Sequence, residues 1–480
     1  MSAPARLALA LAVLLMAAAC SRAPQQPALP EAFACQAGAW SAGPGTVVSL
    51  LPGSDGLRWR LLDGRGGSFD VAGKAPGDTL QSLEGWRSSG PVVATASFAP
   101  CAEARMRIQL ADGPAVDAAR LPLVQRETRF ASDGVELRGR LVLPADSAGP
   151  VPLAVLVHGS GRQSGVDGFA LQHLLPAQGV AVFVYDKRGT AGSDGAYTQD
   201  FHVLAGDAVA ALAHARQLHP GGFSRAGFVG SSQGGWVAPL AASRSDADYV
   251  VSLYGLAENA LAEDREQVLN ELRALGYGDE VLAGAREVTD ATALLMASGF
   301  TRGFDELRAV QARYGEEPWF DRMQGEYTGQ VLRLPAWTPQ WLARSIAARQ
   351  DLGTSWDYEP MPVLQSLDIP QLWVVAADDM EAPNVETLRR IRSLQAAMQP
   401  VDLAIFPGTD HGIFEYEEGE DGRIMLRNPA GYFPMLAAWI QAPGLRGDHG
   451  RAIIEPARTA RAMALPGPVE ASLQASDRTD

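Results

Sequence analysis

The sequence predicts an α/β fold in which a mostly parallel sheet carries helices on both faces. Nearly continuous apolar runs at residues 153–157 and 180–185 are typical of strands that are buried on both faces of a parallel sheet. Helical patterns at residues 169–177 and 205–218 follow these runs in alternation. The 480 residues, of which 47% are hydrophobic, suffice for a large core and for two or three domains.

Residues 1–19 are predicted to be an export signal that lies outside the fold. Arg6 supplies a positive end, an apolar stretch follows, and residues 17–19 form a small-residue cleavage site. The next residue, Cys20, and the Pro/Gln-rich stretch after it resemble a bacterial lipoprotein signal, which implies lipidation of Cys20. Ala17 stands where that signal usually has leucine, so ordinary secretion with the same cleavage site is the alternative.

Residues 20–125 predict a small β-rich domain, because short runs with β character alternate with turns rich in Gly, Asp and Pro. The chain has three cysteines. If Cys20 is acylated, Cys35 and Cys101 remain as an even pair, and we expect them to form a disulfide in an oxidising compartment. The expected location is therefore the periplasm, or the outer membrane of a Gram-negative bacterium.

The α/β domain is predicted in two parts with an insertion between them. An edge hairpin at residues 128–143 opens the first part, and amphipathic helical patterns replace the β/α alternation after residue 254. We expect this insertion to form a helical cap over the site. Its aromatic residues are candidates for an acyl pocket or for the cap's own core: Trp319, Phe320, Trp337, Trp341 and Trp356. The expected segments are 126–257 and 366–442 for the α/β domain, 258–365 for the cap and 443–480 for a disordered tail.

The segment from Gly230 to Gly234 predicts a catalytic serine at Ser232. A short apolar strand precedes this Gly-x-Ser-x-Gly pattern and a helical pattern follows it, which is the context of a nucleophile elbow. The turn is so tight that the flanking positions tolerate almost no side chain. A loop can produce the same pattern by chance, so the other catalytic groups have to support the assignment.

A serine nucleophile needs a base, and the base needs a carboxylate that orients it. His411 follows an apolar strand at residues 401–406 and is the predicted base; His449 lies in a tail without apolar context. The strand before it delivers Asp378 and Asp379, and these residues alone leave the two aspartates nearly equal as the acid. Glu381 is a third carboxylate nearby.

The oxyanion hole needs two backbone N–H donors. Gln233, directly after the nucleophile, supplies one. The turn after residues 153–157 supplies the other, and we favour Ser160 over Gly161. His158 precedes the serine in the chain, so we expect it to pack within the turn and not to act as the base.

Four motifs together resemble the α/β-hydrolases, and most closely the bacterial serine esterases and serine-aminopeptidase-like hydrolases. They are the Gly230–Gly234 elbow, the turn at 158–161, the segment 185–189 and the turn at 410–412. Members often carry Gly-x-x-Asp-x-x-x-Pro at the acid turn. On this sequence the pattern implies that Asp379, four residues before Pro383, is the acid, although Ala376 replaces the glycine. The family's Arg-Gly-x-Gly turn also departs here, in residues 188–192, so we expect that segment to brace the site.

Composition excludes several classes of function. The formal net charge of −15 and a pI near 5.0 disfavour nucleic acid or an anionic membrane as an electrostatic partner. The seven histidines are scattered and the cysteines are widely spaced, so no metal site is predicted. The chemistry requires no cofactor, and membrane contact is expected only through the N-terminal lipid.

We therefore expect a serine hydrolase that cleaves carboxylic esters of small or medium acyl groups through an acyl-enzyme. A serine peptidase of the aminopeptidase type is the first alternative. It would need a carboxylate aimed at the substrate's amine, and the acidic residues of the insertion do not identify one: Glu258, Glu263, Asp264 and Glu266. A non-catalytic envelope protein that keeps the fold for binding is the second alternative.

Overall fold

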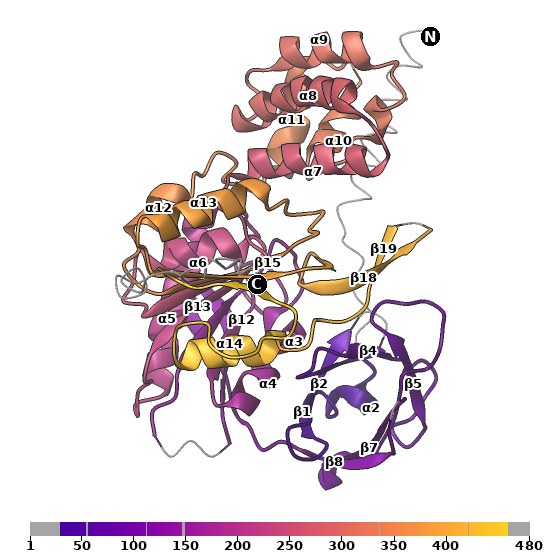
Figure 1. Ribbon diagram of the computed structural model, residues 1–480, viewed down its shortest axis with the longest axis vertical. Helices are drawn as coiled ribbons and strands as arrows, with labels where there is room; N and C mark the ends of the chain where they lie inside the picture. The colour runs from indigo at the N-terminus through magenta and orange to yellow at the C-terminus, as the bar shows by residue number, and fades with distance from the viewer. Residues whose placement is uncertain are drawn as a thin grey trace, which may run out of the picture.

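Three parts follow one another in space in the computed structural model: a β-barrel, an α/β domain and a helical cap at the far end of the molecule (Figure 1). The structure describes residues 29–458, apart from residues 54–55, 112, 146–148, 336 and 421. The predicted export signal, Cys20 and the last part of the predicted tail lie outside the described residues.

Eight antiparallel strands form a closed barrel. β8 pairs with β1 and closes it. Its interior is filled by apolar side chains, among which Trp40, Leu50 and Phe69 are fully buried. The predicted β-rich domain is therefore confirmed. The strands are β1 Gly38–Ser41, β2 Val47–Gly53, β3 Gly56–Leu61, β4 Gly66–Phe69, β5 Leu80–Glu84, β6 Ala94–Phe98, β7 Arg105–Leu110 and β8 Val116–Arg120.

The predicted disulfide joins Cys35 and Cys101, whose Cα atoms lie 6.0 Å apart. Cys35 caps the short helix α2 (Glu31–Ala34), and Cys101 begins the 3-10 turn η1 (Cys101–Glu103). The bridge therefore ties the segment before the first strand to the turn between β6 and β7. It stabilises the barrel mainly by restricting the unfolded chain.

A nine-stranded sheet forms the α/β domain, in the order β20-β16-β15-β14-β13-β11-β12-β10-β9. The strands from β16 to β12 in this order are parallel, and β10, β9 and β20 are antiparallel to their neighbours. The predicted mostly parallel sheet is confirmed. Its strands are β9 Val124–Ser132, β10 Val135–Leu143, β11 Leu153–Val157, β12 Ala181–Tyr185, β13 Ala226–Ser231, β14 Tyr249–Leu253, β15 Gln371–Ala376, β16 Val401–Phe406 and β20 Ile453–Glu455.

Helices cover both faces of this sheet (Figure 1). Successive side chains of a strand point to opposite faces, so Val155 packs with the helices of one face and Ala154 with those of the other. The cap-side face carries α5 Phe201–Leu218, α6 Gly234–Ala242, α12 Met361–Ser366 and α13 Val385–Ala396, and the opposite face carries α3 Gly165–Gly168, α4 Leu171–Leu174 and α14 Tyr432–Gln441.

After β14 the chain leaves the sheet and builds the cap, which has its own core. Leu269, Val288 and Leu295 are fully buried in that core. The first three helices match the amphipathic patterns that the sequence shows at residues 261–275, 280–298 and 304–314. The cap helices are α7 Ala260–Ala274, α8 Asp279–Ala297, α9 Phe304–Tyr314, α10 Thr328–Leu332 and α11 Gln340–Gln350.

The prediction of a disordered tail from residue 443 is wrong for residues 443–458. Within them, β20 adds to the sheet edge beside β16, and Glu455 forms an ion pair of 2.6 Å with Arg392 of α13. Only three residues form this strand, and Pro456 follows it. A run this short gives no periodic signal in the sequence, and the free edge of β16 decides its conformation.

A small antiparallel sheet extends from the α/β domain toward the barrel (Figure 1). It consists of β17 Thr409–Asp410, β18 Phe414–Gly419 and β19 Gly422–Met425. Its ion pair between Glu417 and Arg87 of the barrel has an N···O distance of 2.6 Å. In residues 29–458, as far as they are described, no helix combines the length and apolar character that a membrane crossing requires.

Candidate active site

Ser232 lies in a strained turn between β13 and α6. Its backbone has φ +53°, in the left-handed region that non-glycine residues rarely adopt. The Ser232 N–H donates to Leu253 O at 3.0 Å, and its carbonyl oxygen accepts from Gly235 N at 2.6 Å. These bonds hold the hydroxyl at the carboxyl end of the parallel strands, which is where ligand sites gather in α/β sheets.

The two flanking glycines are required by close backbone contacts. A Cβ atom on Gly230 would lie 1.9 Å from the carbonyl oxygen of Gly234, and one on Gly234 would lie 2.4 Å from that of Val157. Both distances are far shorter than any real contact. The tight turn predicted from the Gly-x-Ser-x-Gly pattern is therefore observed.

His411 and Asp379 are brought together by the ends of two neighbouring strands, β16 and β15. His411 Nδ1 lies 3.0 Å from Asp379 Oδ2 and 3.2 Å from Oδ1. Asp379 Oδ1 also accepts the backbone N–H groups of Glu381 at 3.1 Å and Ala382 at 2.7 Å. Asp379 is 5% exposed, so its carboxylate is held in one orientation toward the imidazole.

The neighbouring aspartates have other partners. Asp378 accepts a long hydrogen bond of 3.4 Å from the Tyr416 hydroxyl. Asp410 accepts from the backbone N–H of His411 at 2.8 Å and from Arg423 Nη1 at 2.8 Å. Of Asp378 and Asp379, the structure therefore places only Asp379 against the imidazole of His411.

The surroundings of His411 favour its protonated form. Burial alone would lower the pKa of the imidazole, but the hydrogen bond and charge of Asp379, with smaller contributions from Glu381 and Asp410, raise this pKa to about 9. The ring packs edge-on against Tyr254, with the ring centroids 4.9 Å apart. Tyr254 has φ +42°, so the backbone is strained on this side of the site as well.

Within the described chain, no hydrogen bond joins the Ser232 hydroxyl to His411. His411 Nε2 instead lies 3.6 Å from Glu381 Oε1. Catalytic hydrogen bonds often tighten only when substrate is bound. Glu381, which follows Asp379 in the same turn, therefore lies close to His411 Nε2, the nitrogen that would accept the proton of Ser232.

The two predicted oxyanion donors lie on turns that Lys187 connects. Lys187 Nζ donates to Gly159 O at 2.6 Å and to Gln233 Oε1 at 3.0 Å. Lys187 is 1% exposed. Burial, with the positive charge of Arg162, lowers its pKa to about 7. The sequence predicts that residues 188–192 brace the site, and this connection through Lys187 is not part of that prediction.

Arg188 and His158, which also belong to the sequence motifs, make contacts that support the fold. Arg188 forms a two-pronged ion pair with Asp207, with distances of 2.6 and 2.8 Å. His158 packs against Tyr185 with ring centroids 5.0 Å apart, and its ring nitrogens have no hydrogen-bond partner among the described residues. Burial and the charge of Lys187 hold the pKa of His158 well below its usual value.

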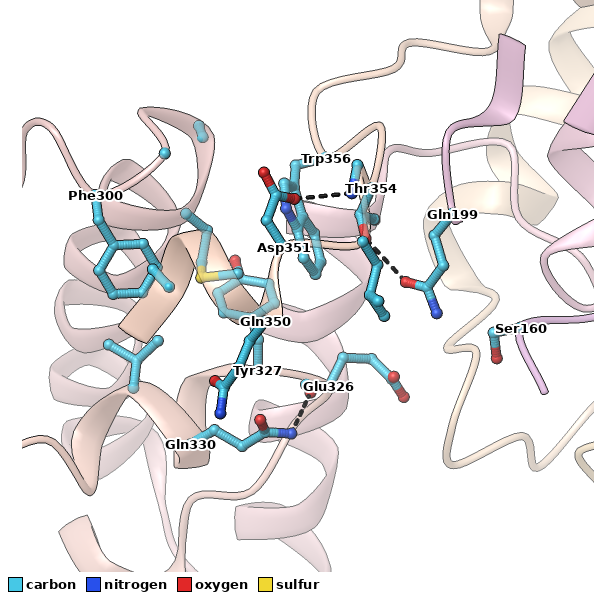
Figure 2. A pocket seen from close by; sticks show the side chains of 18 of the residues that line it. Ser160, Gln199, Phe300, Glu326, Tyr327, Gln330, Gln350, Asp351, Thr354 and Trp356 are labelled. Atoms are coloured by element: carbon cyan, nitrogen blue, oxygen red, sulfur yellow. Dashed lines mark hydrogen bonds between the residues drawn. The ribbon is translucent and has the colours of Figure 1, made fainter. Parts of the chain in front are cut away.

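A cavity of about 710 Å³ extends from Ser232 into the cap. Figure 2 shows Ser160 and Gln199 at its core side and Phe300 at the opposite end, among the cap helices. A hydrogen bond of 2.8 Å from Thr354 to Gln199 links the two sides. The cap end is lined mainly by apolar side chains: Met296, Phe300, Val331, Leu334, Ala343, Ile346 and Ala347.

Of the five aromatic residues that the sequence offers for this pocket, only Trp356 lines it. Trp319 and Phe320 belong to the core of the cap. Trp337 and Trp341 are 62% and 69% exposed. Other aromatic side chains, such as Phe300 and Tyr327, line the pocket. The sequence carries no signal that separates aromatic residues that line the pocket from those that do not.

Three glutamates line the same cavity: Glu263 from α7, Glu326 before α10, and Glu381. Burial and the charge of Glu381 raise the pKa of Glu326 to about 7, and the pKa of Glu263 is raised for similar reasons. The other acidic candidates lie elsewhere. Asp264 accepts hydrogen bonds from Tyr327 N and Thr328 within the cap. The residues the structure describes contain no cluster of three or more potential metal ligands.

Comparison with known proteins identifies the family. The model of the alpha/beta hydrolase family matches residues 154–421, which is more than half of the chain. A search of curated proteins finds no match. The match begins at β11 and ends in the turn after β18, so it covers the elbow, the cap and the histidine turn.

Solved structures that the search matches include an acylaminoacyl peptidase from Pyrococcus horikoshii, at 16% identity and a TM-score of 0.42. That match covers 85% of this chain but only 56% of the peptidase. An esterase from Pyrococcus furiosus has 14% identity and a TM-score of 0.38, over 61% of this chain and 84% of the esterase. Est1E from Butyrivibrio proteoclasticus, with bound ferulic acid, has 18% identity and a TM-score of 0.36, over 59% and 90%.

Proposed function

The chain belongs to the alpha/beta hydrolase family, and on that premise we propose that it is a serine hydrolase. Its substrates are carboxylic esters of small or medium acyl groups, and Ser232, Asp379 and His411 are its catalytic residues. One observation carries the proposal: the strained Ser232 lines the same cavity as Glu381, and Glu381 lies beside Asp379, the carboxylate that holds His411.

Each group has a defined step. Ser232 Oγ attacks the acyl carbonyl carbon while His411 Nε2 accepts the hydroxyl proton. The N–H groups of Ser160 and Gln233 stabilise the oxyanion of the tetrahedral intermediate. Collapse of the intermediate expels the alcohol, which takes the proton from His411. Water then attacks the acyl-enzyme with His411 again as base, and the carboxylic acid leaves as Ser232 regains its proton.

The shape of the cavity supports an acyl ester as substrate. Its polar end contains Ser232, Ser160 and Gln233, and its opposite end is built from apolar side chains of the cap. An acyl carbonyl at Ser232 directs its chain toward Phe300, where burial of each CH₂ contributes about 0.8 kcal/mol. A volume of about 710 Å³ accommodates acyl groups of medium length.

A serine peptidase of the aminopeptidase type is the second candidate, and the glutamates of the cavity favour it. Such an enzyme needs a carboxylate near the nucleophile to bind the substrate's amine. Glu263 and Glu326 line the same cavity as Ser232. A Glu263→Gln change would then weaken cleavage of free aminoacyl amides and leave simple esters unaffected.

We also propose that the chain is exported and anchored through a lipid on Cys20. The apolar leader and the Cys20 context support export, and the Cys35–Cys101 disulfide is compatible with an oxidising compartment. Mass analysis of the mature N-terminus from a Gram-negative host tests this. An unmodified, freely soluble N-terminus would favour ordinary secretion.

The central experiment compares the parent protein with Ser232→Ala on a chain-length series of aryl esters and on aminoacyl amides. We expect ester turnover to fall by several orders of magnitude in the variant, because no other group forms the acyl-enzyme. A fluorophosphonate should label the parent and not Ser232→Ala. The neighbouring Ser231→Ala is the matched control and should keep both properties. Labelling that persists in Ser232→Ala would contradict the assignment.

A further inference from the structure

A second cavity, of about 210 Å³, lies between the barrel and the α/β domain. One wall comes from β3, β4 and the turn after β5. The other wall comes from residues 168–171, from the segment directly after His411 and from the start of α14. Figure 1 shows β4 of the barrel on the side of β18, and residues of both strands line the cavity. Ester hydrolysis as proposed above makes no use of it.

Arg60 brings a positive charge without a carboxylate partner to this cavity. Its guanidinium donates to Gly64 O at 3.2 Å, and within the described chain no carboxylate forms an ion pair with it. Burial, together with the charge of Arg58, lowers the pKa of Arg60 to about 10. A partly buried cation without a counterion is energetically unfavourable. An anion in the cavity would remove that cost.

Ser68 is a second, independent sign of a missing ligand. Its hydroxyl group is buried and has no hydrogen-bond partner among the described residues. Ser68 lines the same cavity as Arg60. Buried polar groups in native proteins are nearly always paired, so an unpaired hydroxyl in the same cavity as a cation that has no carboxylate partner calls for an explanation.

The remaining walls are aromatic and apolar. Trp86 and Phe414 meet edge-on, with ring centroids 4.8 Å apart, and the Arg60 guanidinium lies 5.8 Å from the first ring and 5.1 Å from the second. Phe169 and Phe433 also line the cavity. These surfaces suit a ligand with a flat apolar part next to its anionic group.

We propose that this cavity binds a small organic anion, a carboxylate or phosphate attached to a planar apolar group, through Arg60 and Ser68. The site adjoins the histidine turn: Gly412, the next residue after His411, and Tyr254, which packs on His411, both line it. The ligand would therefore lie directly behind the proposed catalytic base. The proposal does not depend on ester hydrolysis.

Isothermal titration calorimetry on the purified protein, at constant ionic strength, tests the site. The probes are benzoate, phenyl phosphate, inorganic phosphate and the neutral benzamide. We expect saturable binding of benzoate or phenyl phosphate, weak binding of inorganic phosphate and none of benzamide. Comparison of the affinities for benzoate and phenyl phosphate then shows whether the site prefers a carboxylate or a phosphate.

Arg60→Gln should weaken binding of the aromatic anion at least tenfold, and Ser68→Ala should weaken it by a smaller factor. Arg105→Gln is the matched control, because Arg105 is an exposed barrel arginine that pairs with Glu103. Arg60→Gln would not change benzoate binding in the cavity of Ser232. Weaker benzoate binding in this variant therefore assigns the binding to the second cavity.

Three results would overturn the proposal: equal binding of benzamide and benzoate, unchanged binding in Arg60→Gln, or no binding of either aromatic anion by the parent. Circular dichroism checks that each variant is folded. If Arg60→Gln does not fold, Ser68→Ala decides: unchanged anion affinity in that variant then counts against the site.

Discussion

Lys187 donates a hydrogen bond from its buried side-chain nitrogen to the carbonyl oxygen of Gly159, at 2.6 Å. A second bond, of 3.0 Å, reaches Gln233 Oε1. Gly159 precedes Ser160, and Gln233 follows Ser232, so one side chain fixes the distance between the two turns that carry the proposed oxyanion donors. Geometry of this kind matters because a displaced donor stabilises the oxyanion poorly.

Lys187→Met should therefore lower kcat of ester hydrolysis by about tenfold to hundredfold, less than the 10²–10³ that loss of a whole donor costs. KM should change little, because the ground-state carbonyl does not need the oxyanion geometry. Lys74, the chain's only other lysine, is exposed, and Lys74→Met is the control. A rise in KM with unchanged kcat would contradict this positioning role.

Asp379→Asn should lower kcat on the order of 10⁴-fold, because an amide presents the wrong partner to His411 Nδ1 and selects the wrong tautomer. Asp378→Asn should have a mild effect, since Asp378 bonds to Tyr416 at 3.4 Å. Steady-state kinetics on one aryl ester measures both variants. Equal losses would mean that both carboxylates support the histidine.

Ester hydrolysis should increase with pH up to about 9, because His411 acts as a base only after it loses the proton that its raised pKa, about 9, retains. Glu381→Gln removes a negative charge 3.6 Å from His411 Nε2. The pKa of His411 should then fall, and the ascending limb of the kcat/KM profile should move to lower pH. Glu316→Gln, on an exposed cap residue, should leave the profile in place. A shift to higher pH in Glu381→Gln would contradict the electrostatic reading.

Ala347→Trp should fill the apolar end of the large cavity, since Ala347 of α11 lines it. We expect medium-chain esters to lose most of their kcat/KM while acetate esters keep theirs, because only longer acyl groups reach α11. Ala312→Trp adds the same ring to an exposed site on α9 and serves as control. A uniform loss across the chain-length series would indicate general damage to the cap.

Replacing Cys35 and Cys101 by Ser should destabilise the barrel by roughly 2–5 kcal/mol, because the bridge no longer restricts the unfolded chain. Denaturant unfolding monitored by circular dichroism measures this loss. Ester hydrolysis should persist where the barrel remains folded, since the bridge lies in the barrel and not in the turns that carry Ser232 or His411. Unchanged stability would show that packing alone holds the barrel.

The sequence by itself determined the fold class and the tight turn around Ser232. Apolar strand runs and helical periods depend on residues that are close in the chain, and the Gly230–Gly234 turn is a local steric requirement. The pairing of Cys35 with Cys101 followed from counting. None of these conclusions needs the relative placement of distant segments.

Only the tertiary structure decided which side chains meet. The residues alone left Asp378 and Asp379 nearly equal and the family resemblance favoured Asp379; the contact of Asp379 with His411 itself depends on the direction in which the chain turns after β15. The short strand β20 exists because β16 offers it a free edge. Lys187 reaches Gly159 and Gln233, and Arg60 faces Phe414, across sequence separations of 28, 46 and more than 300 residues. Contacts over such separations leave no periodic pattern in the sequence, because they arise from the packing of whole elements.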